Sequence, residues 1–236
     1  MPGKNIPEQD LIDQIGPIWR ELWNDVWHVT HPERFLSILD DGAILPNPNI
    51  PDKVRWKTAR GAEFYPYVRS IDGVSIFDFR DFDAVWYQEH YPLSSWHEFV
   101  NLHRDFGKWT GAVWLRLNAP LIEPQTIWGK QLVAKWKEDN RLGQTIMPRI
   151  ECAHIGPIPL ACICQIIFIR SRDNGTYHTW KLENFDRPAY ENLVTEWRKD
   201  YETLRNRPRK IHMPSSDVPH DLAARLKAAK RRLKRD

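Results

Sequence analysis

The sequence predicts an α+β fold with about six β-strands and flanking helices. Two strands are expected near 149–155 and 163–170, the second a nearly unbroken apolar run typical of a strand buried on both faces, and apolar side chains recur at helical spacing over 187–205. With 236 residues, 42% of them hydrophobic, the chain is long enough for one large domain, or for one domain with an extension. We expect a helical N-terminal segment over 1–24, a central domain over 25–205 and a basic tail over 206–236.

The first part of the chain is predicted as helix, strand, helix and loop. A helix is expected over 8–22 and a short alternating strand over 25–30. Thr30-His-Pro-Glu33 has the pattern of a capping box, so a second helix should begin there with Thr30 as its cap. Gly42 is expected to end that helix. Residues 46–70 lack periodicity and predict a long loop, a feature that is usually functional.

The rest of the chain alternates strand and helix patterns. The expected elements are a strand at 73–79, an aromatic loop around Tyr87, a capped helix at 95–106, a strand at 111–117, a helix at 126–136 and a polar loop at 138–145. A Gly-Pro-Ile-Pro turn should join the two central strands into a hairpin. Asp173-Asn-Gly175 then folds a last strand, 176–182, back against 163–170, ahead of the helix at 187–205.

Composition narrows the class of protein. The 12 Trp residues predict that some indoles line a surface or cleft where flat ligands stack, although a Trp-rich core is an equal alternative for any one ring. The net charge of +3 neither requires nor excludes nucleic acid.

Cysteine usage and hydropathy bear on the compartment. The three cysteines, at 152, 162 and 164, form neither a disulfide framework nor a zinc pattern, so we expect buried thiols in a reducing compartment and no metal. An apolar leader and a membrane-length apolar run are both absent from the sequence. We therefore expect a cytoplasmic protein that does not bind membranes.

Polar residues stand out on three predicted strands. Glu151 lies at the start of the strand expected at 149–155, and a carboxylate entering a buried sheet is costly unless it is paired, hydrogen-bonded or facing a cleft. Glu151 is therefore either a structural acid whose hydrogen bonds are satisfied or a functional acid. His28 and Ser75 are each compatible with an interior or incidental role when considered alone.

The order of these residues resembles the motifs of the ADP-ribosyltransferase superfamily. Trp27-His28-Val29-Thr30 followed by Phe35-Leu-Ser-Ile-Leu-Asp-Asp-Gly42 is similar to the first motif, a His-x-Thr strand end before a helix of pattern Leu-x-x-Ile-Leu-x-x-Gly. Gly73-Val-Ser75 resembles the second motif, and Arg149-Ile-Glu151 resembles the third. The resemblance covers residues 25–170 and is greatest to the DarT-like branch, which modifies nucleic acid.

The resemblance implies a split β-sheet core and the use of NAD as ADP-ribose donor. Cleavage of the nicotinamide–ribose bond develops positive charge on the ribose, which a fixed carboxylate stabilises; the resemblance assigns that role to Glu151. It also implies that His28 and Thr30 bind the adenosine ribose side, that the main chain at Val29 grips the nicotinamide amide, and that Ser75 shapes the nicotinamide pocket. An aromatic ring, Tyr65, Tyr67 or Phe79, would stack there.

Two cationic positions extend the expected site. The resemblance places an Arg for the NAD diphosphate in the loop after the first helix, where Arg55, Arg60 and Arg69 qualify and Arg60 is favoured. Superfamily members that modify arginine carry a second Glu where this chain has Arg149, so transfer to protein arginine is not expected. A cation there suits a phosphate-bearing acceptor, or it forms an ion pair with Glu151 or another acid.

The sequence thus predicts an NAD-dependent mono-ADP-ribosyltransferase that modifies DNA or RNA, and by the resemblance a bacterial toxin of a toxin–antitoxin or phage-defence system with an antitoxin partner. A protein or small-molecule acceptor stays open. The alternatives are an RNA 2′-phosphotransferase and a non-catalytic protein that binds nucleic acid or a partner. A metal-dependent nuclease is disfavoured, because His97 and His103 fall on different faces of their predicted helix.

Overall fold

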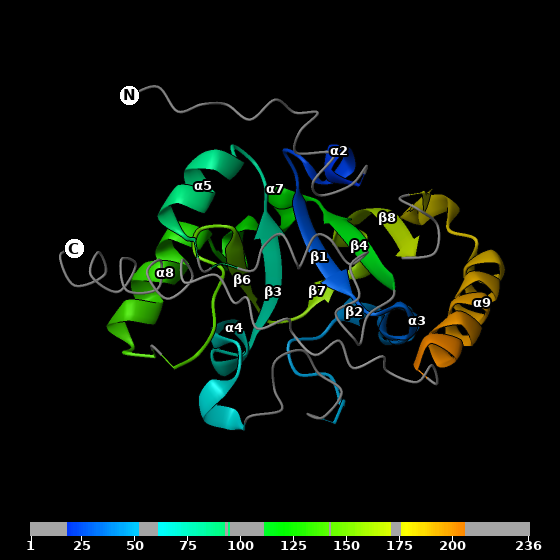
Figure 1. Cartoon of the computed structure of the whole chain (residues 1–236), viewed down its shortest axis with the longest axis horizontal. Coiled ribbons are helices and arrows are strands. Elements are labelled where there is room, and N and C mark those ends of the chain that lie inside the picture. Colours follow the sequence, from blue (N-terminus) through cyan, green and yellow to red (C-terminus); the bar gives the residue numbers. More distant parts are fainter. Residues whose placement is uncertain are drawn as a thin grey trace, which may run out of the picture. The chain divides into compact units, whose positions relative to one another are not determined.

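The structure is a computed structural model that describes residues 18–51, 61–92, 94, 111–141, 143–170 and 176–205. The chain divides into two compact units, Met1–Lys199 and Asp200–Asp236, and the account below concerns the first. The fold is α+β, as the sequence predicts, and is built on a seven-stranded antiparallel sheet (Figure 1). Residues 8–17 of the helix expected over 8–22, the helix expected at 95–106 and the turn at 173–175 lie outside the described residues.

The order of strands in the sheet differs from their order in the chain. From edge to edge the strands are β5 (Thr126–Ile127), β6 (Glu151–Ile155), β3 (Gly73–Asp78), β1 (Val26–Thr30), β4 (Gly111–Leu117), β8 (Ile163–Arg170) and β9 (Tyr177–Lys181). Every neighbouring pair is antiparallel. A second, two-stranded sheet pairs β2 (Ala43–Ile44) with β7 (Ile158–Pro159).

Helices precede β1, follow β9 and lie in most of the connections between the strands. The α-helices are α2 (Trp19–Leu22), α3 (Pro32–Asp41), α4 (Tyr67–Ser70), α5 (Ala84–His90), α7 (Ala119–Ile122), α8 (Gly129–Glu138) and α9 (Arg187–Arg205). Short 3-10 turns lie at Ala62–Phe64, Glu123–Gln125, Leu160–Cys162 and Leu182–Asn184.

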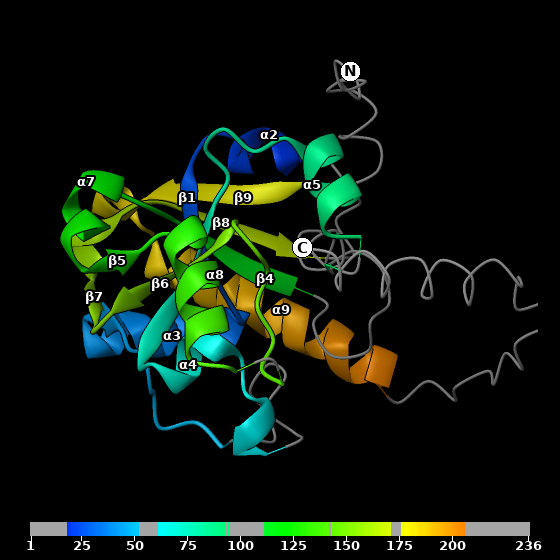
Figure 2. The same ribbon diagram turned by 90° about the vertical axis from the view of Figure 1, so that its left-hand side faces the viewer.

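The two faces of the sheet bury different sets of side chains. On one face, Trp27, Phe77, Trp114 and Ile167 belong to a core cluster that α2 and α5 join. On the other face, rings from α3 and α9 pack together, because Phe35 of α3 lies 5.2 Å from Tyr190 of α9 and that ring lies 5.4 Å from Phe168 of β8. Figure 2 shows α2 and α9 on opposite sides of β8 and β9. The sheet is therefore covered on both faces.

The expected hairpin of the two central strands is wrong. β6 pairs with β3 and β5, whereas β8 pairs with β4 and β9, so three strands separate β6 from β8. The segment 156–162 between them contributes β7 to the small sheet instead of making a tight turn. The predicted return of the last strand against β8 is confirmed, and so are the bounds of α9.

Two helices lie where loops were expected, and a third begins later than expected. The aromatic loop around Tyr87 is α5, which begins where the Asp83 carboxylate accepts a hydrogen bond from Trp86 N at 2.9 Å. The helix expected from 126 begins at Gly129, because residues 126–127 pair with β6 as β5. The long loop at 46–70 contains α4, whose first amide, Tyr67 N, donates to Thr145 O.

The cap of α3 is His31 and not Thr30. His31 Nδ1 accepts a hydrogen bond from Glu33 N at 3.3 Å, and Pro32 takes the first helical position. The imidazole also lies edge-on to Trp197 of α9. Gly42 ends the helix with φ 72°, as the sequence predicts.

This cap makes stability depend on pH. Burial lowers the pKa of His31 to about 4, so the unfolded chain, with an ordinary value of 6.5, takes up the proton first. The cap is complete above pH 6.5 and is lost as the pH falls towards 4. We expect the free energy of unfolding to fall by about 1–2 kcal/mol more between pH 7 and 4.5 in the native chain than in His31→Asn, which keeps a cap that does not titrate. Urea denaturation at both pH values measures this, and equal losses in the two proteins would contradict it.

Among the described residues, no helix combines the length and the apolarity that crossing a membrane requires.

Candidate active site

Three of the residues predicted from the sequence meet at Ser75. Ser75 Oγ donates a hydrogen bond to Glu151 Oε1 at 2.6 Å, and His28 Nδ1 lies 2.9 Å from the main-chain oxygen of Ser75. The contacts form because β3 lies between β1 and β6 in the sheet. They join residues that are 47 and 76 positions apart in the chain.

The contact with Ser75 fixes the state of the His28 ring. A carbonyl oxygen only accepts, so Nδ1 carries the proton and donates it. Burial lowers the pKa of His28 to about 4, although the hydrogen bond to Ser75 opposes the shift, so the ring is neutral at pH 7. Its Nε2 is therefore a hydrogen-bond acceptor, suited to a hydroxyl group of a ligand.

Glu151 is a buried carboxylate held by its own turn. Its side chain is only 6% exposed, and Oε2 accepts from Met147 N at 2.8 Å. Glu151 N in turn donates to Met147 O at 2.9 Å, which closes the turn over 147–151. Both carboxylate oxygens thus have a donor, so the position and orientation of the acid are fixed.

The ladder between β1 and β3 is short at this point. Only Val26 and Trp27 are paired with β3, although β1 continues to Thr30. Trp27 and Val29 share a face of the sheet with Ser75 and Glu151, and the alternation of the strand directs the Cβ of His28 to the other face. His28 and Glu151 therefore approach each other through Ser75, at the strand edge where the ladder stops.

The remaining residues of the expected NAD site are spread more widely. Thr30 is 8% exposed and pairs with Val113, and the Arg69 guanidinium stacks 3.8 Å above the Tyr65 ring. Tyr67 donates to Asp139 at 2.6 Å, and burial together with this carboxylate raises its pKa. Arg55 and Arg60 lie outside the described residues.

Phe79 does not fit a role in stacking nicotinamide. Its ring is 0% exposed and packs edge-on between Trp19 at 5.2 Å and Phe82 at 5.8 Å. The expectation is corrected because Phe79 follows the last residue of β3 and points into the main core.

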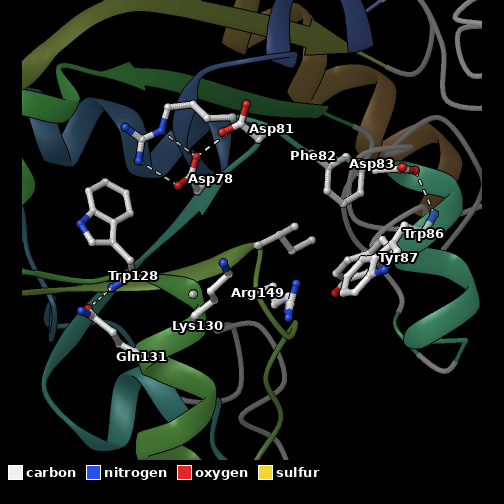
Figure 3. Close-up of a pocket in the computed structure, with 13 residues that line it drawn as sticks. Asp78, Asp81, Phe82, Asp83, Trp86, Tyr87, Trp128, Lys130, Gln131 and Arg149 are labelled. Atoms are coloured by element: carbon white, nitrogen blue, oxygen red, sulfur yellow. Dashed lines mark hydrogen bonds and ion pairs between the residues drawn. The ribbon is translucent and has the colours of Figure 1, made fainter.

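A hollow of about 550 Å³ opens beside the turn that carries Glu151 (Figure 3). Its wall comprises Asp78, Arg80, Asp81, Phe82, Asp83, Trp86, Tyr87, Trp128, Gly129, Lys130, Gln131, Arg149 and Ile150. The wall of this hollow does not include His28, Ser75 or Glu151. Among the described residues that the sequence singles out for a site, Arg149 alone lines it.

Two guanidinium groups stack on indole rings in this hollow. Arg149 lies 4.4 Å above Trp86, and Arg80 lies 4.5 Å above Trp128. Arg80 also forms a bidentate ion pair with Asp78, with both contacts at 2.9 Å. The open alternative of an ion pair between Arg149 and Glu151 is not seen. The high Trp content was the one signal in the sequence for such a surface.

The thiol and phenol groups near Glu151 are not ionised. Burial raises the pKa of Cys152, and burial together with the nearby Glu151 charge raises the pKa of Tyr87, despite the hydrogen bond to Ser94. Neither group is prepared to act as a nucleophile. The acid–base chemistry available at this point is that of Glu151 and the neutral His28.

In the parts of the chain that the structure describes, no group of three or more His, Cys, Asp or Glu side chains is placed to bind a metal ion. No protein-family model, curated protein or solved structure matches the chain.

Proposed function

We propose that this protein is an NAD-dependent mono-ADP-ribosyltransferase that modifies nucleic acid. The observation that carries the proposal is the chain of contacts from His28 through Ser75 to Glu151. The sequence motifs singled out these three residues separately, and they lie on three neighbouring strands, β1, β3 and β6, joined through Ser75. If each of the three residues had only a structural role, contacts among them would not be required.

The arrangement suits the cleavage of an N-glycosidic bond. When the bond between nicotinamide and ribose C1′ breaks, its electron pair leaves with nicotinamide and positive charge develops on the ribose. Glu151, held by Ser75 and Met147 N, presents a fixed negative charge without reorganisation. An acceptor atom then bonds to C1′ and releases its proton to water.

The residues of β1 supply groups for holding the dinucleotide. His28 Nε2 accepts from a ribose hydroxyl, and Thr30 lies two residues further along the strand. The main chain at Val29 lies beyond the last pair of the β1–β3 ladder, and by the sequence resemblance it would grip the nicotinamide carboxamide. Arg60, Arg55 or Arg69 would neutralise the diphosphate.

The acceptor side supports nucleic acid through its charge and aromatic surface. Arg149 lies two residues before Glu151 and lines the hollow with Lys130 and two indoles. A surface that combines cationic and aromatic groups is suited to a nucleotide, because the phosphate is anionic and the base can stack on the rings. By the sequence resemblance, we also propose a cytoplasmic toxin of a toxin–antitoxin or phage-defence system, controlled by an antitoxin.

One observation favours a second function, in which the protein binds nucleic acid or a partner without catalysis. Both oxygens of Glu151 accept hydrogen bonds from within the protein, which is also what a purely structural acid does. In that case the chain binds nucleic acid or a partner without catalysis.

Incubation with NAD labelled in its adenylate half, with separate pools of DNA, RNA and protein, tests the proposal. We expect a nucleic-acid pool to become labelled and nicotinamide to be released in proportion. Label on protein alone would refute the nucleic-acid acceptor. If nicotinamide is not released and no pool is labelled, the non-catalytic function is correct.

A further inference from the structure

We infer that Arg149 is a positioning residue, which holds the strained turn before Glu151 in place by stacking its guanidinium on Trp86 of α5. The inference rests on the proposed function only in its consequence for catalysis. The contact and its effect on the turn are properties of the folded chain, so they can be measured without NAD or nucleic acid.

The turn before Glu151 has a main-chain geometry that few residues adopt. Ile150 N donates to Pro148 O at 2.8 Å, and Arg149 between them has φ 68°. A hydrogen bond between residues two apart, around a positive φ, is the pattern of the strained form of the γ-turn, which is rare. Such strain persists only where the surrounding contacts hold it, and it is concentrated at functional sites.

Main-chain contacts fix the residues on both sides of Arg149. Asp78 N donates to Ile150 O at 2.8 Å, and Glu151 N donates to Met147 O at 2.9 Å. The guanidinium of Arg149 adds a contact to a different element, because it lies 4.4 Å above the Trp86 ring. Figure 3 shows Arg149 extending from its turn towards α5. The side chain therefore ties the turn to a helix that the hydrogen bonds of the turn do not reach.

The helix α5 provides a fixed platform for this contact. The His90 ring stacks on the Trp86 indole, 4.0 Å away and at 18° to it, and His90 Nδ1 donates to Trp86 O at 2.7 Å. The next residue, Tyr87, is 1% exposed and belongs to the main core. The indole is thus held by its own helix, and the helix is held by the core.

The ring, and not an acid, holds the guanidinium. In the part of the chain that the structure describes, Arg149 forms no ion pair. Arginine is suited to this contact, because its planar guanidinium stacks on an aromatic face and keeps its charge at physiological pH. This gives Arg149 a role that does not depend on the presence of an acceptor.

The position of α5 matters to the carboxylate. Burial raises the pKa of Tyr87, and the charge of Glu151 adds to the shift, so the helix lies close to the acid. The proposed reaction needs a carboxylate whose position is fixed before the ribose becomes charged. A turn that moves away from α5 would take Glu151 with it, and a small displacement of a catalytic group lowers the rate strongly.

Amide hydrogen exchange of the full chain tests the tie without substrates. Arg149→Asn removes the guanidinium and supplies a residue that tolerates a positive φ, so the turn can still form. We expect the amides of Met147 and Glu151 to exchange about five- to tenfold faster than in the native chain, which is the weight of one such contact. The amide of Leu115, in the centre of the sheet, should keep its native rate. Native rates at both turn amides, or an equal acceleration at all three, overturn the inference.

Variants of the ring and of a neighbouring cation locate the tie. Trp86→Leu should accelerate the same amides, Trp86→Phe should recover most of the protection, and the double variant Arg149→Asn/Trp86→Leu should add little to either single change. Lys130→Gln is the matched control, because Lys130 lines the same hollow but forms neither a ring contact nor an ion pair among the described residues. Multiplied effects in the double variant, or an equal effect of Lys130→Gln, contradict a tie between these two side chains.

Steady-state kinetics separate positioning from acceptor binding. With nucleic acid at saturation, Arg149→Asn and Trp86→Leu should each lower kcat for nicotinamide release about tenfold and leave KM for NAD near its native value. If Arg149 acts only by binding the acceptor, Arg149→Asn raises KM for nucleic acid and keeps the native kcat. That result overturns the positioning role.

The two readouts also separate this inference from the proposed function. If the variants loosen the turn while the native chain releases no nicotinamide from NAD, the tie is supported and the enzyme is refuted. If the native chain cleaves NAD and the variants keep its kcat, the enzyme is supported and Arg149 is not a positioning residue.

Discussion

Glu151→Gln lowers the rate of ADP-ribosyl transfer by about 10²–10³-fold while leaving the fold intact. The loss is expected because the amide has no charge to set against the positive ribose in the transition state, and one preorganised electrostatic group contributes about this much to catalysis. NAD binding in the ground state should change little. The effect therefore falls on the turnover rate and not on the affinity for NAD.

The fold should tolerate this substitution because Gln can keep the hydrogen bonds to Ser75 and Met147. The amide oxygen accepts from Met147 N, and the amide nitrogen donates to Ser75 Oγ, since a hydroxyl group both donates and accepts. The free energy of unfolding should change by about 1 kcal/mol or less. A structural acid and a catalytic acid thus give different results for the same variant.

The measurement pairs nicotinamide release with urea denaturation, and Glu138→Gln at the exposed end of α8 is the matched control. If Glu151→Gln retains the native turnover rate, Glu151 is not the catalytic carboxylate. If activity falls only as far as the folded fraction falls, Glu151 is a structural residue of the turn.

Local patterns in the sequence predict the long elements of this fold. The strand ending at Thr30, the glycine after α3 and the 19-residue helix α9 each follow from periodicity and capping within one segment. The cap at His31 was missed because Ser, Thr, Asp and Asn are the usual caps, and an imidazole nitrogen accepts a hydrogen bond only when the ring is neutral. The two-residue strand β5 was missed because its pairing to β6 leaves no local pattern.

Sequence patterns of this kind do not predict which distant strands pair. β6 and β8 are adjacent in the chain and suggested a hairpin, yet the sheet places β3, β1 and β4 between them. The same topology brings Ser75 to Glu151, which the motifs could name but not place together. The hollow was not foreseen, since its wall comes from three segments, 78–87, 128–131 and 149–150, whose proximity depends on that topology.

The approach of α8 to the turn before Glu151 depends on one glycine. A Cβ on Gly129 would overlap the carbonyl group of Arg149 and lie 2.7 Å from its Cα, so both opposing groups are main chain. Arg149 is itself in the left-handed region, with φ 68°, which leaves the turn little freedom to move away. The start of α8 and the strand that carries Glu151 are thereby held in close contact.

Gly129→Ala is therefore expected to destabilise the protein by about 2 kcal/mol. Alanine in a helix gains up to about 1 kcal/mol over glycine, but overpacking against main chain that cannot rotate away costs about 1–3 kcal/mol, and more at this separation. Gly143→Ala is the control, because its Cβ would have its nearest neighbour, Glu63 O, at 3.8 Å. Urea denaturation compares the two variants, and an equal or greater loss in Gly143→Ala would show that close packing at Gly129 does not hold the turn.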